Sequence, residues 1–506
     1  MVNKEIIIRK NAYFDSVTLM SISADIKGLD GVIDSVVSMA TPMNKELLKR
    51  VNLFSDEVDK CDEYDLVIAF SHDETITKEA ILDYLDNALN GQNENAAGEK
   101  TDVVYKSIKA AKKDNDNANM AIISVPGEHA KREVMEALKQ GLNVMLFSDN
   151  VTLEDEIELK KYAVEHELLV MGPDCGTAYI NGTGLCFANR VNDGVIGIAG
   201  ASGTGMQELM VLVDKYGGGI SNAIGVGGRD LREEVGGLMM MEALKMLNAD
   251  EKTRVILMVS KVPAQSVSEK LLKLIKSDIN KPVVIYYATD MTFSNEENIY
   301  YAKSLKEAAI TAVNISKNIY SDVEELDAFE RKNIQGKYIR GLYCGGTLCA
   351  EAYYFLRNHI NDVRSNIASH DEEKVKDAFV NEGNMLLDMG DDLFTQGRPH
   401  PMIDPTLRLD RIMECATDKE TKVILLDFEL GYGSHEDPVG ATIDTILKAH
   451  KAAEEIGKTL IFVTYVQGTG KDFQNKFQSE KLLKEAGCIV CESNIDAVVK
   501  AYEMIG

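Results

Sequence analysis

Short apolar runs alternate with amphipathic stretches along almost the whole chain. The amphipathic stretches, such as 130–140 and 266–277, have the spacing of helices that bury one face. Apolar runs joined by helical crossovers are typical of parallel sheets covered on both faces. We therefore predict an α/β protein with strands at 66–70, 120–124, 142–147, 168–171, 195–199, 255–259, 283–287, 423–427, 460–464 and 488–492.

Two of the predicted strands are followed by nearly the same turn. Ile198–Glu208 and Gly341–Glu351 each run from a strand through a Gly-Thr turn into a helix, with a glutamate four residues after the threonine. Free backbone N–H groups at a helix start bind phosphate and other oxyanions, although one such turn alone is as well explained by tight packing. Because the turn occurs twice, we predict one shared anion site. Its phosphate-binding residues are Ser202, Gly203, Thr204, Gly205, Gly345, Gly346 and Thr347.

Two further loops carry charged side chains. In Gly225–Glu233, paired glycines precede Arg229 and Arg232, which we predict to bind a substrate carboxylate; the alternative is pairing with neighbouring acids.

The second loop, Gly397–Arg408, holds three of the nine prolines, which restricts its backbone. The alternative for this loop is a rigid surface turn. From it we predict catalytic acid–base and anion-binding groups at His400, Arg398 and Asp404, and a further carboxylate-binding residue at Arg408.

Composition narrows the choice of partner. The 506 residues include 81 acidic and 55 basic ones, and the net charge of -26 argues against nucleic acid and anionic membranes. No N-terminal apolar stretch and no run of eighteen apolar residues is present, so we expect neither export nor a membrane span. The eight cysteines lack metal-ligand spacing, which predicts no metal site and reduced, mostly buried thiols, and therefore a cytoplasmic protein. The carboxylates of Asp388–Asp392 favour a capped turn over a Mg²⁺ site.

The length calls for about three domains. Asn90–Asn119 is polar and reads as a surface excursion, whereas the charged stretch Ser316–Gly336 precedes a new strand and reads as a linker. A further boundary is placed at Asn192–Gly194, where a turn precedes a new strand and helix. We predict domains at 1–193, 194–330 and 336–506.

These motifs resemble those of the FdrA family, acyl-CoA synthetase-like proteins related to succinyl-CoA synthetase. The resemblance runs almost end to end and includes 13–20, 147–156, 171–177, 200–208, 223–237, 341–351 and 397–408. It implies a Rossmann-like CoA-binding-type domain at 1–193. Two flavodoxin-like, succinyl-CoA-synthetase-type ligase domains would follow, of α type at 194–330 and of β type at 336–506. In the synthetases, the two Gly-turn helices together bind the phosphate of a phosphohistidine.

The chain departs from the synthetases in three respects. The glycine loop that binds CoA near the N-terminus of the synthetases is missing here. Residues 286–310, where the phosphohistidine loop would follow the strand at 281–285, contain no histidine. There is also no room for the large nucleotide-grasping domain. The FdrA family is associated with oxamate carbamoyltransferase, which interconverts oxalurate plus phosphate with oxamate plus carbamoyl phosphate in anaerobic allantoin degradation and needs neither a phosphohistidine nor a nucleotide. We therefore predict a carbamoyl- or acyl-phosphate-handling transferase subunit of this kind.

Two alternatives stay open. The first is an acyl-CoA synthetase that receives its nucleotide site from a partner chain, and the second is a non-catalytic scaffold or regulatory subunit. The expected partners are a small phosphorylated or carboxylate metabolite, the other subunits of a hetero-oligomeric complex, and further copies of this chain. CoA and Mg²⁺ are the candidate cofactors, and neither is assigned to residues.

Overall fold

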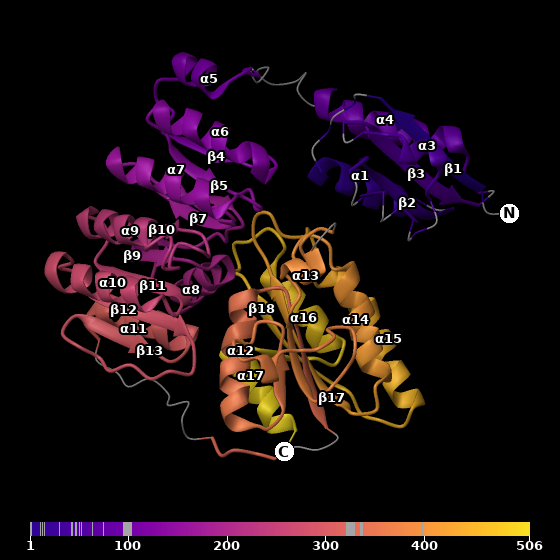
Figure 1. The fold of residues 1–506 in the computed structure, drawn as a ribbon. Helices are drawn as coiled ribbons and strands as arrows, with labels where there is room; N and C mark the ends of the chain where they lie inside the picture. The colour runs from indigo at the N-terminus through magenta and orange to yellow at the C-terminus, as the bar shows by residue number, and fades with distance from the viewer. Residues whose placement is uncertain are drawn as a thin grey trace. The chain divides into compact units, whose positions relative to one another are not determined.

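The computed structural model describes most of the chain (Figure 1). It describes residues 3–94 apart from 11, 13, 15, 30, 42, 43, 46, 47, 50, 52, 63 and 74, and then 104–319, 329–333, 337–395 and 398–505. Parts of the predicted excursion (95–103) and of the predicted linker (320–328 and 334–336) lie outside the described residues. The chain forms two compact units, Met1–Tyr105 with Thr395–Pro399, and Lys106–Phe394 with His400–Gly506.

The first unit is built on a small antiparallel sheet. Its strand order is β1-β3-β2, and alternate residues of β3, such as Val67 and Ile68, belong to separate apolar clusters. The elements are β1 (Asn3–Arg9), α1 (Ser16–Lys27), β2 (Val32–Met39), α3 (Asp56–Asp59), β3 (Leu66–His72) and α4 (Lys78–Glu94). These first strands pair antiparallel and enclose their own apolar clusters, whereas the Rossmann-like domain over 1–193 stays a prediction.

The second unit begins with a three-stranded parallel sheet. Its order is β4-β5-β6, with helices between the strands as the sequence pattern predicts. The elements are α5 (Ile108–Asp114), β4 (Met120–Ile123), α6 (Gly127–Lys139), β5 (Asn143–Leu146), α7 (Leu153–Glu165) and β6 (Val170–Met171). Val144 of β5 and Ile256 of the next sheet belong to one apolar cluster, so the two sheets share a core.

A seven-stranded sheet comes next, in the order β13-β12-β11-β9-β10-β7-β8. Five strands are parallel, and the β7–β8 hairpin adds antiparallel to β10. This sheet therefore takes residues from before the predicted boundary at 193. The elements are β7 (Thr177–Ile180), β8 (Thr183–Cys186), β9 (Asp193–Gly200), α8 (Gly203–Lys215), β10 (Ile220–Gly225), α9 (Leu238–Ala249), β11 (Val255–Lys261), α10 (Gln265–Asp278), β12 (Val283–Ala288), β13 (Ile299–Ala302) and α11 (Leu305–Lys317).

A six-stranded parallel sheet completes the unit, in the order β15-β16-β14-β17-β18-β19. Leu342 of the central strand β14 pairs with Leu387 on one side and Leu426 on the other. The elements are β14 (Tyr338–Tyr343), α12 (Gly346–His359), β15 (Val363–Ser365), the 3₁₀ turn η2 (Asp371–Glu373), β16 (Asn384–Asp388), α13 (Asp392–Thr395), α14 (Thr406–Thr417), β17 (Thr421–Glu429), α15 (Gly440–Glu455), β18 (Ile461–Gln467), α16 (Lys476–Glu485), β19 (Ile489–Cys491) and α17 (Asn494–Met504). The predicted α/β class with parallel sheets is confirmed.

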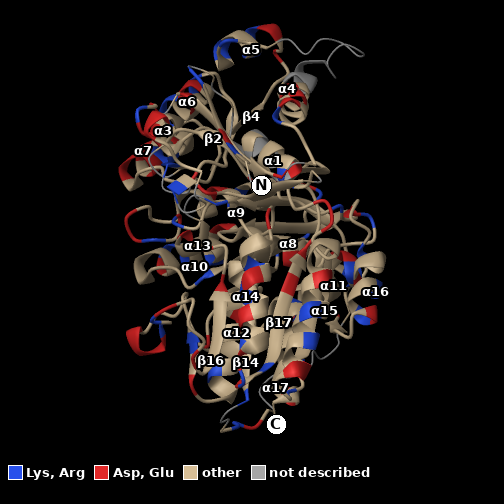
Figure 2. Cartoon of the chain, turned by 90° about the vertical axis from the view of Figure 1, so that its right-hand side faces the viewer, with Lys and Arg blue, Asp and Glu red and all other residues tan. Residues whose placement is uncertain are grey.

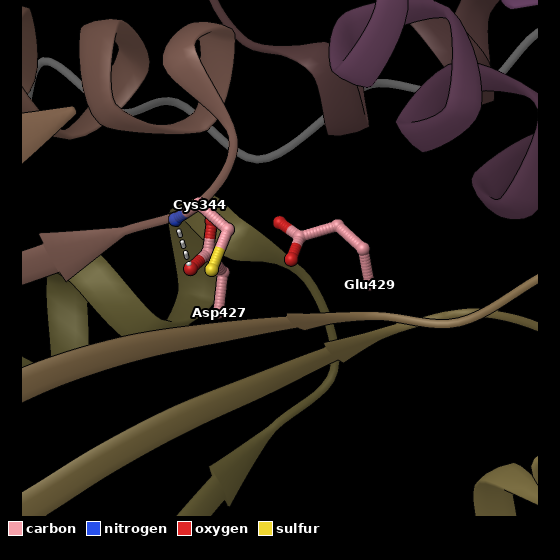
Figure 3. A group of neighbouring side chains, drawn as sticks. All are labelled: Cys344, Asp427 and Glu429. Carbon is pink, nitrogen blue, oxygen red and sulfur yellow. Dashed lines mark hydrogen bonds between the residues drawn. The ribbon is translucent and has the colours of Figure 1, made fainter. Parts of the chain in front are cut away.

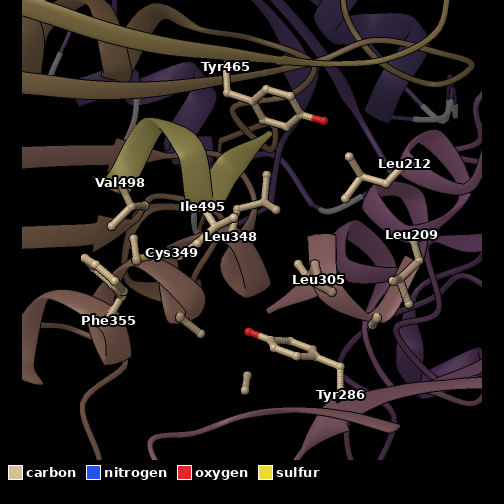
Figure 4. Close-up of a cluster of buried hydrophobic side chains, with 14 of the residues drawn as sticks. Leu209, Leu212, Tyr286, Leu305, Leu348, Cys349, Phe355, Tyr465, Ile495 and Val498 are labelled. Atoms are coloured by element: carbon tan, nitrogen blue, oxygen red, sulfur yellow. The ribbon is translucent and has the colours of Figure 1, made fainter. Parts of the chain in front are cut away.

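One apolar core joins the seven-stranded and six-stranded sheets. Leu209 and Leu212 of α8 and Leu305 of α11 pack in the same cluster as Leu348 of α12 and Val498 of α17 (Figure 4). Because interiors of this kind are close-packed, the helices that share the cluster have little freedom to shift against one another. The starts of α8 and α12 are held in place by this packing.

Charged residues lie mainly on the helices and loops rather than on the strands (Figure 2). In Figure 2 the strands of the sheets are mostly tan, whereas red and blue stretches lie on helices and loops, for instance along α7. Among the described residues, no helix combines the length and the apolar character needed to cross a bilayer. All eight cysteines are free thiols, and six of them are buried, as the sequence predicts.

We expect Leu209→Ala to lower the free energy of unfolding by about 2–5 kcal/mol, because it removes a fully buried side chain from the core between the two sheets. Urea denaturation followed by circular dichroism measures the change. Leu447→Ala is the matched control, since Leu447 is 49% exposed, and a surface change of this kind stays within about 0.5 kcal/mol. Equal effects of the two substitutions would contradict the packing described.

Candidate functional site

The two Gly-Thr turns meet in the structure. α8 begins after β9 with Ser202 as its N-cap, and the Ser202 Oγ accepts the Gly205 N–H at 3.0 Å. α12 begins after β14 with Gly345 as its N-cap. The Ser202 and Thr347 hydroxyl groups are hydrogen-bonded to each other. Two helix starts far apart in the sequence therefore face one another, and their positive ends converge.

Glycine is required where the two turns approach. A Cβ on Gly205 would lie 2.9 Å from the Thr347 Cγ2 and 2.7 Å from the Ser202 Oγ. A Cβ on Gly346 would lie 2.5 Å from the Asp388 Oδ2. All three distances are shorter than packed side chains tolerate, so a larger residue at Gly205 would press on the facing turn and one at Gly346 would displace Asp388.

Each helix start retains backbone donors. The first N–H groups of a helix have no intrahelical acceptor, and at α12 the N-cap glycine has no side chain to supply one. At α8 the buried Thr177 Oγ1 would lie 3.3 Å from a Cβ on Gly203, and it has no hydrogen-bond partner among the described residues. A buried hydroxyl without a partner is costly. An anion at the helix start would satisfy both groups.

The glutamates at the repeated position are buried behind the turns. The Glu208 Oε2 accepts from the Tyr465 hydroxyl at 2.8 Å and from the Gln467 Nε2 at 3.2 Å, and Gln467 also donates to the Thr204 carbonyl at 3.1 Å. The Glu351 carboxyl accepts from the Leu305 N–H and from the Asn494 Nδ2, each at 2.8 Å. Burial raises the pKa of Glu208, and that of Glu351 to about 7. Both glutamates therefore tie the turns to neighbouring elements.

A buried acidic group lies under the α12 turn. The Asp427 carboxylate accepts the N–H groups of Cys344 and Gly345 at 2.8 Å each, and Glu429 lies beside it (Figure 3). The Cys344, Asp427 and Glu429 ligand atoms lie within 4.8 Å of one another, a spacing that a metal ion can bridge. However, the buried Arg408 Nη1 lies 2.8 Å from the Cys344 Sγ and 3.1 Å from the Asp427 Oδ1. The guanidinium already supplies the positive charge, so the group does not fit a resident metal ion.

Three family models match parts of the chain. They are "CoA-ligase" at 342–503, "AllF, heavy metal-associated domain" at 1–104, and "CoA binding domain" at 76–148 and 191–288. The protein YahF of Escherichia coli (strain K12) is 45% identical over 510 residues, which cover 99% of this chain and 98% of YahF. The chain belongs to the YahF family.

The chain is also similar to succinate–CoA ligase α subunits, at lower identity. The α subunit of the ADP-forming succinate–CoA ligase of Aquifex aeolicus is 30% identical over 191 residues, which cover 37% of this chain and 61% of that subunit. The α subunit 1 of Archaeoglobus fulgidus is 28% identical over 214 residues, or 41% of this chain and 71% of that subunit. The chain thus spans under two thirds of the Aquifex subunit.

Two solved structures are also similar to parts of the chain. The dinucleotide forming acetyl-coenzyme A synthetase 1 of Ca. Korarchaeum cryptofilum is 14% identical, with a TM-score of 0.35 and coverage of 80% of this chain and 86% of that one. The ATP citrate lyase of Methanothrix soehngenii is 16% identical, with a TM-score of 0.36 and coverage of 44% and 43%.

The predicted catalytic residues lie in different surroundings. The His400 ring would overlap a Cβ on Gly390, packs near Phe187, and accepts the Met402 N–H at its Nδ1, at 3.2 Å. Burial lowers the pKa of His400 to about 4, so the imidazole is neutral at pH 7. The Asp404 Oδ1 accepts from the Thr406 N–H and hydroxyl at the start of α14. Arg398 is exposed. The catalytic roles of His400, Arg398 and Asp404 stay predictions.

Two of the three predicted carboxylate-binding arginines already have protein partners. The Arg229 Nε pairs with the buried Glu156 at 2.8 Å, and its Nη2 donates to the Val151 carbonyl. Arg408 pairs with Asp427, as described above. Arg232 is exposed. Substrate binding by these residues stays a prediction.

Sequence reasoning missed the acids at the end of β17. The predicted strand at 423–427 ends at Asp427, and the sequence pattern assigns neither this residue nor Glu429 to the site. The sequence feature that could identify them is an acidic side chain at the carboxyl end of an apolar strand, because ligands of parallel sheets bind at that end. Their position beneath the turn follows from the pairing of β17 with β14, whose end leads directly into α12.

We expect Gly205→Ala to lower the melting temperature by several degrees, because its Cβ would press on both hydroxyl residues of the paired turns. The cost of overpacking, about 1–3 kcal/mol, exceeds the gain of about 1 kcal/mol from replacing glycine in a helix. Gly228→Ala is the control, since a Cβ there meets nothing within 4 Å. Scanning calorimetry compares the two, and an unchanged melting temperature for Gly205→Ala would contradict the close approach.

Proposed function

We propose that this chain is an acyl-transferring subunit of an acyl-CoA synthetase-like enzyme, with a phosphate group bound between the starts of α8 and α12. The observation that carries the proposal is the hydrogen bond between Ser202 and Thr347, which joins the two Gly-Thr turns. The matches to the CoA-ligase and CoA-binding family models support the same reaction class. So do the succinate–CoA ligase relatives.

The proposed reaction uses the helix starts to stabilise a leaving phosphate. The CoA thiolate attacks the acyl carbon of an acyl phosphate. The bond between this carbon and the oxygen that bridges to phosphorus breaks, and acyl-CoA and inorganic phosphate result. Negative charge builds on the phosphate oxygens during this step, and preoriented N–H and hydroxyl donors stabilise it. We assign the nucleotide that would make the acyl phosphate to a partner chain, because only residues 318–337 lie between α11 and β14, where the synthetases have a nucleotide-grasping domain before the β-type ligase domain.

A second candidate is the carbamoyl transfer of the FdrA family, in which oxalurate and phosphate give oxamate and carbamoyl phosphate. It is favoured by one observation: the sequence has no histidine between 167 and 358, so a phosphohistidine like that of the synthetases has no residue there to form on. Free phosphate or carbamoyl phosphate would then occupy the paired turns. Arg232, the exposed one of the three arginines predicted to bind a carboxylate, is the candidate for binding the carboxylate of the second substrate.

Calorimetric titrations of the purified chain with inorganic phosphate, CoA and carbamoyl phosphate test both candidates. The acyl-CoA synthetase-like function predicts binding of phosphate and of CoA. Carbamoyl phosphate binding without CoA binding would instead support the carbamoyltransferase. If none of the three binds, both proposals fail.

We expect Thr347→Val to weaken phosphate binding by about 10- to 100-fold, since a hydrogen bond to a charged group contributes about 1.5–3 kcal/mol. Ser202→Ala should act in the same direction but also removes the N-cap of α8. Ser107→Ala is its matched control, because Ser107 caps α5 in the same way, away from the paired turns. Equal phosphate affinity in Thr347→Val and the unaltered chain would contradict the proposed site.

A further inference from the structure

Two carboxyl groups lie against the glycines that begin α12. Glu429 ends β17, and its Oε1 would lie 3.1 Å from a Cβ on Gly345. Asp388 ends β16, and its Oδ2 would lie 2.5 Å from a Cβ on Gly346. Since β16 and β17 flank β14 on opposite sides, the carboxyl groups approach the turn from both sides.

The Glu429 carboxyl group has an unsatisfied oxygen. Glu429 is 2% exposed, and its Oε1 has no hydrogen-bond partner among the residues that the structure describes. In Figure 3 this carboxyl group points toward Cys344 and Asp427, at the entrance to α12. A charged oxygen without a partner is very costly to bury, whereas a carboxylic acid costs less and can donate to a ligand.

The Asp388 carboxyl group is held in place on one side only. Its Oδ1 accepts the Gly390 N–H at 3.0 Å. The Asp388 backbone is clamped by Asn366, which donates to the Asp388 carbonyl and accepts the Asp388 N–H, both at 2.9 Å. The Oδ2 is thereby directed at Gly346, where a bound anion would meet the helix start.

We propose that Asp388 and Glu429 contact the anion at the α12 turn as carboxylic acids, each donating a hydrogen bond to it, so that the site takes up an anion together with a proton. This inference rests on the proposed function, because it assigns proton donors to the same site. Two ionised carboxylates beside a phosphate would repel it, whereas two acids add donors to those of the helix start.

The titration of these groups is consistent with that role. Burial, together with Asp391 and Asp427, raises the pKa of Asp388 to about 7, against the opposing effects of the Gly390 N–H and Lys261. Burial, the charge of Asp427 and a hydrogen bond to the Asp427 carboxyl group raise the pKa of Glu429 well above its usual range, against the opposing charge of Arg408. The titratable groups that face Asp388 from the packed elements are Lys261, Cys344, Cys349, Asp391 and Asp427. Because the anion prefers the acid form, affinity is full below pH 7 and falls as the pH rises.

Sulfate is a suitable probe, since it stays a dianion from pH 6 to 9 and its own titration does not interfere. We expect calorimetry to show sulfate affinity falling about tenfold per pH unit above pH 7, the slope of one linked proton. At pH 8, the heat measured in buffers of different ionisation enthalpy should report uptake of about one proton. Zero proton uptake and a flat pH profile in the unaltered chain would overturn the inference.

Substitutions test which carboxyl group takes up the proton that accompanies sulfate binding. Asp388→Asn supplies an uncharged donor, so we expect it to bind sulfate at pH 8.5 at least tenfold more tightly than the unaltered chain, with a flat profile. Asp392→Asn, on the exposed start of α13, should keep the slope. Glu429→Gln should keep sulfate binding, whereas Glu429→Ala should weaken it. A thermal melt of each variant identifies any loss of folding.

The outcomes separate this inference from the proposed function. Sulfate binding that Thr347→Val weakens, but that shows the same pH slope in Asp388→Asn as in the unaltered chain, overturns the inference and leaves the anion site standing. Absence of sulfate binding at every pH in the folded chain overturns both.

Discussion

The packing of α8 against α12 within one apolar core is the interaction on which the candidate site depends. Each helix starts at the carboxyl end of a strand in a different sheet, so its N–H donors alone would face an open edge. Leu209 and Leu212 on one side and Leu348 on the other share a cluster that brings the two starts within hydrogen-bond distance. The dipoles and hydroxyl groups of the two turns then converge on one point.

The same convergence explains the carboxyl groups around the site. Parallel strands deliver their last side chains to one edge of the sheet, and in this chain several of them are acids. Arg408 neutralises Asp427, while burial favours the acid forms of Glu351, Asp388 and Glu429. Protonation of these carboxyl groups therefore lowers the negative charge of the region, as pairing with arginine does. An incoming anion meets fewer negative charges than the number of acidic residues indicates.

Sequence patterns predicted the strands, the helix starts and the pairing of the two turns, because each of these depends on residues that are close in the chain. The repeat of Gly-Thr and glutamate predicted that the two turns lie together, and the Ser202 and Thr347 hydroxyl groups are hydrogen-bonded to each other. The arginines show the limit of that reasoning. Arg229 and Arg408 are as well suited to a substrate as to a protein carboxylate, and Glu156 and Asp427, far from them in sequence, became their partners.

The sequence by itself determined the α/β class and the two strand–Gly-Thr–helix turns, since apolar periodicity and glycine placement act locally. Only the tertiary structure decided that 1–105 forms its own antiparallel unit, and that the β7–β8 hairpin joins the seven-stranded sheet. It also decided that Glu429 and Asp388 flank α12. The physical reason is that strand pairing and burial depend on long-range packing, and burial, rather than residue type, sets which carboxyl groups hold a proton.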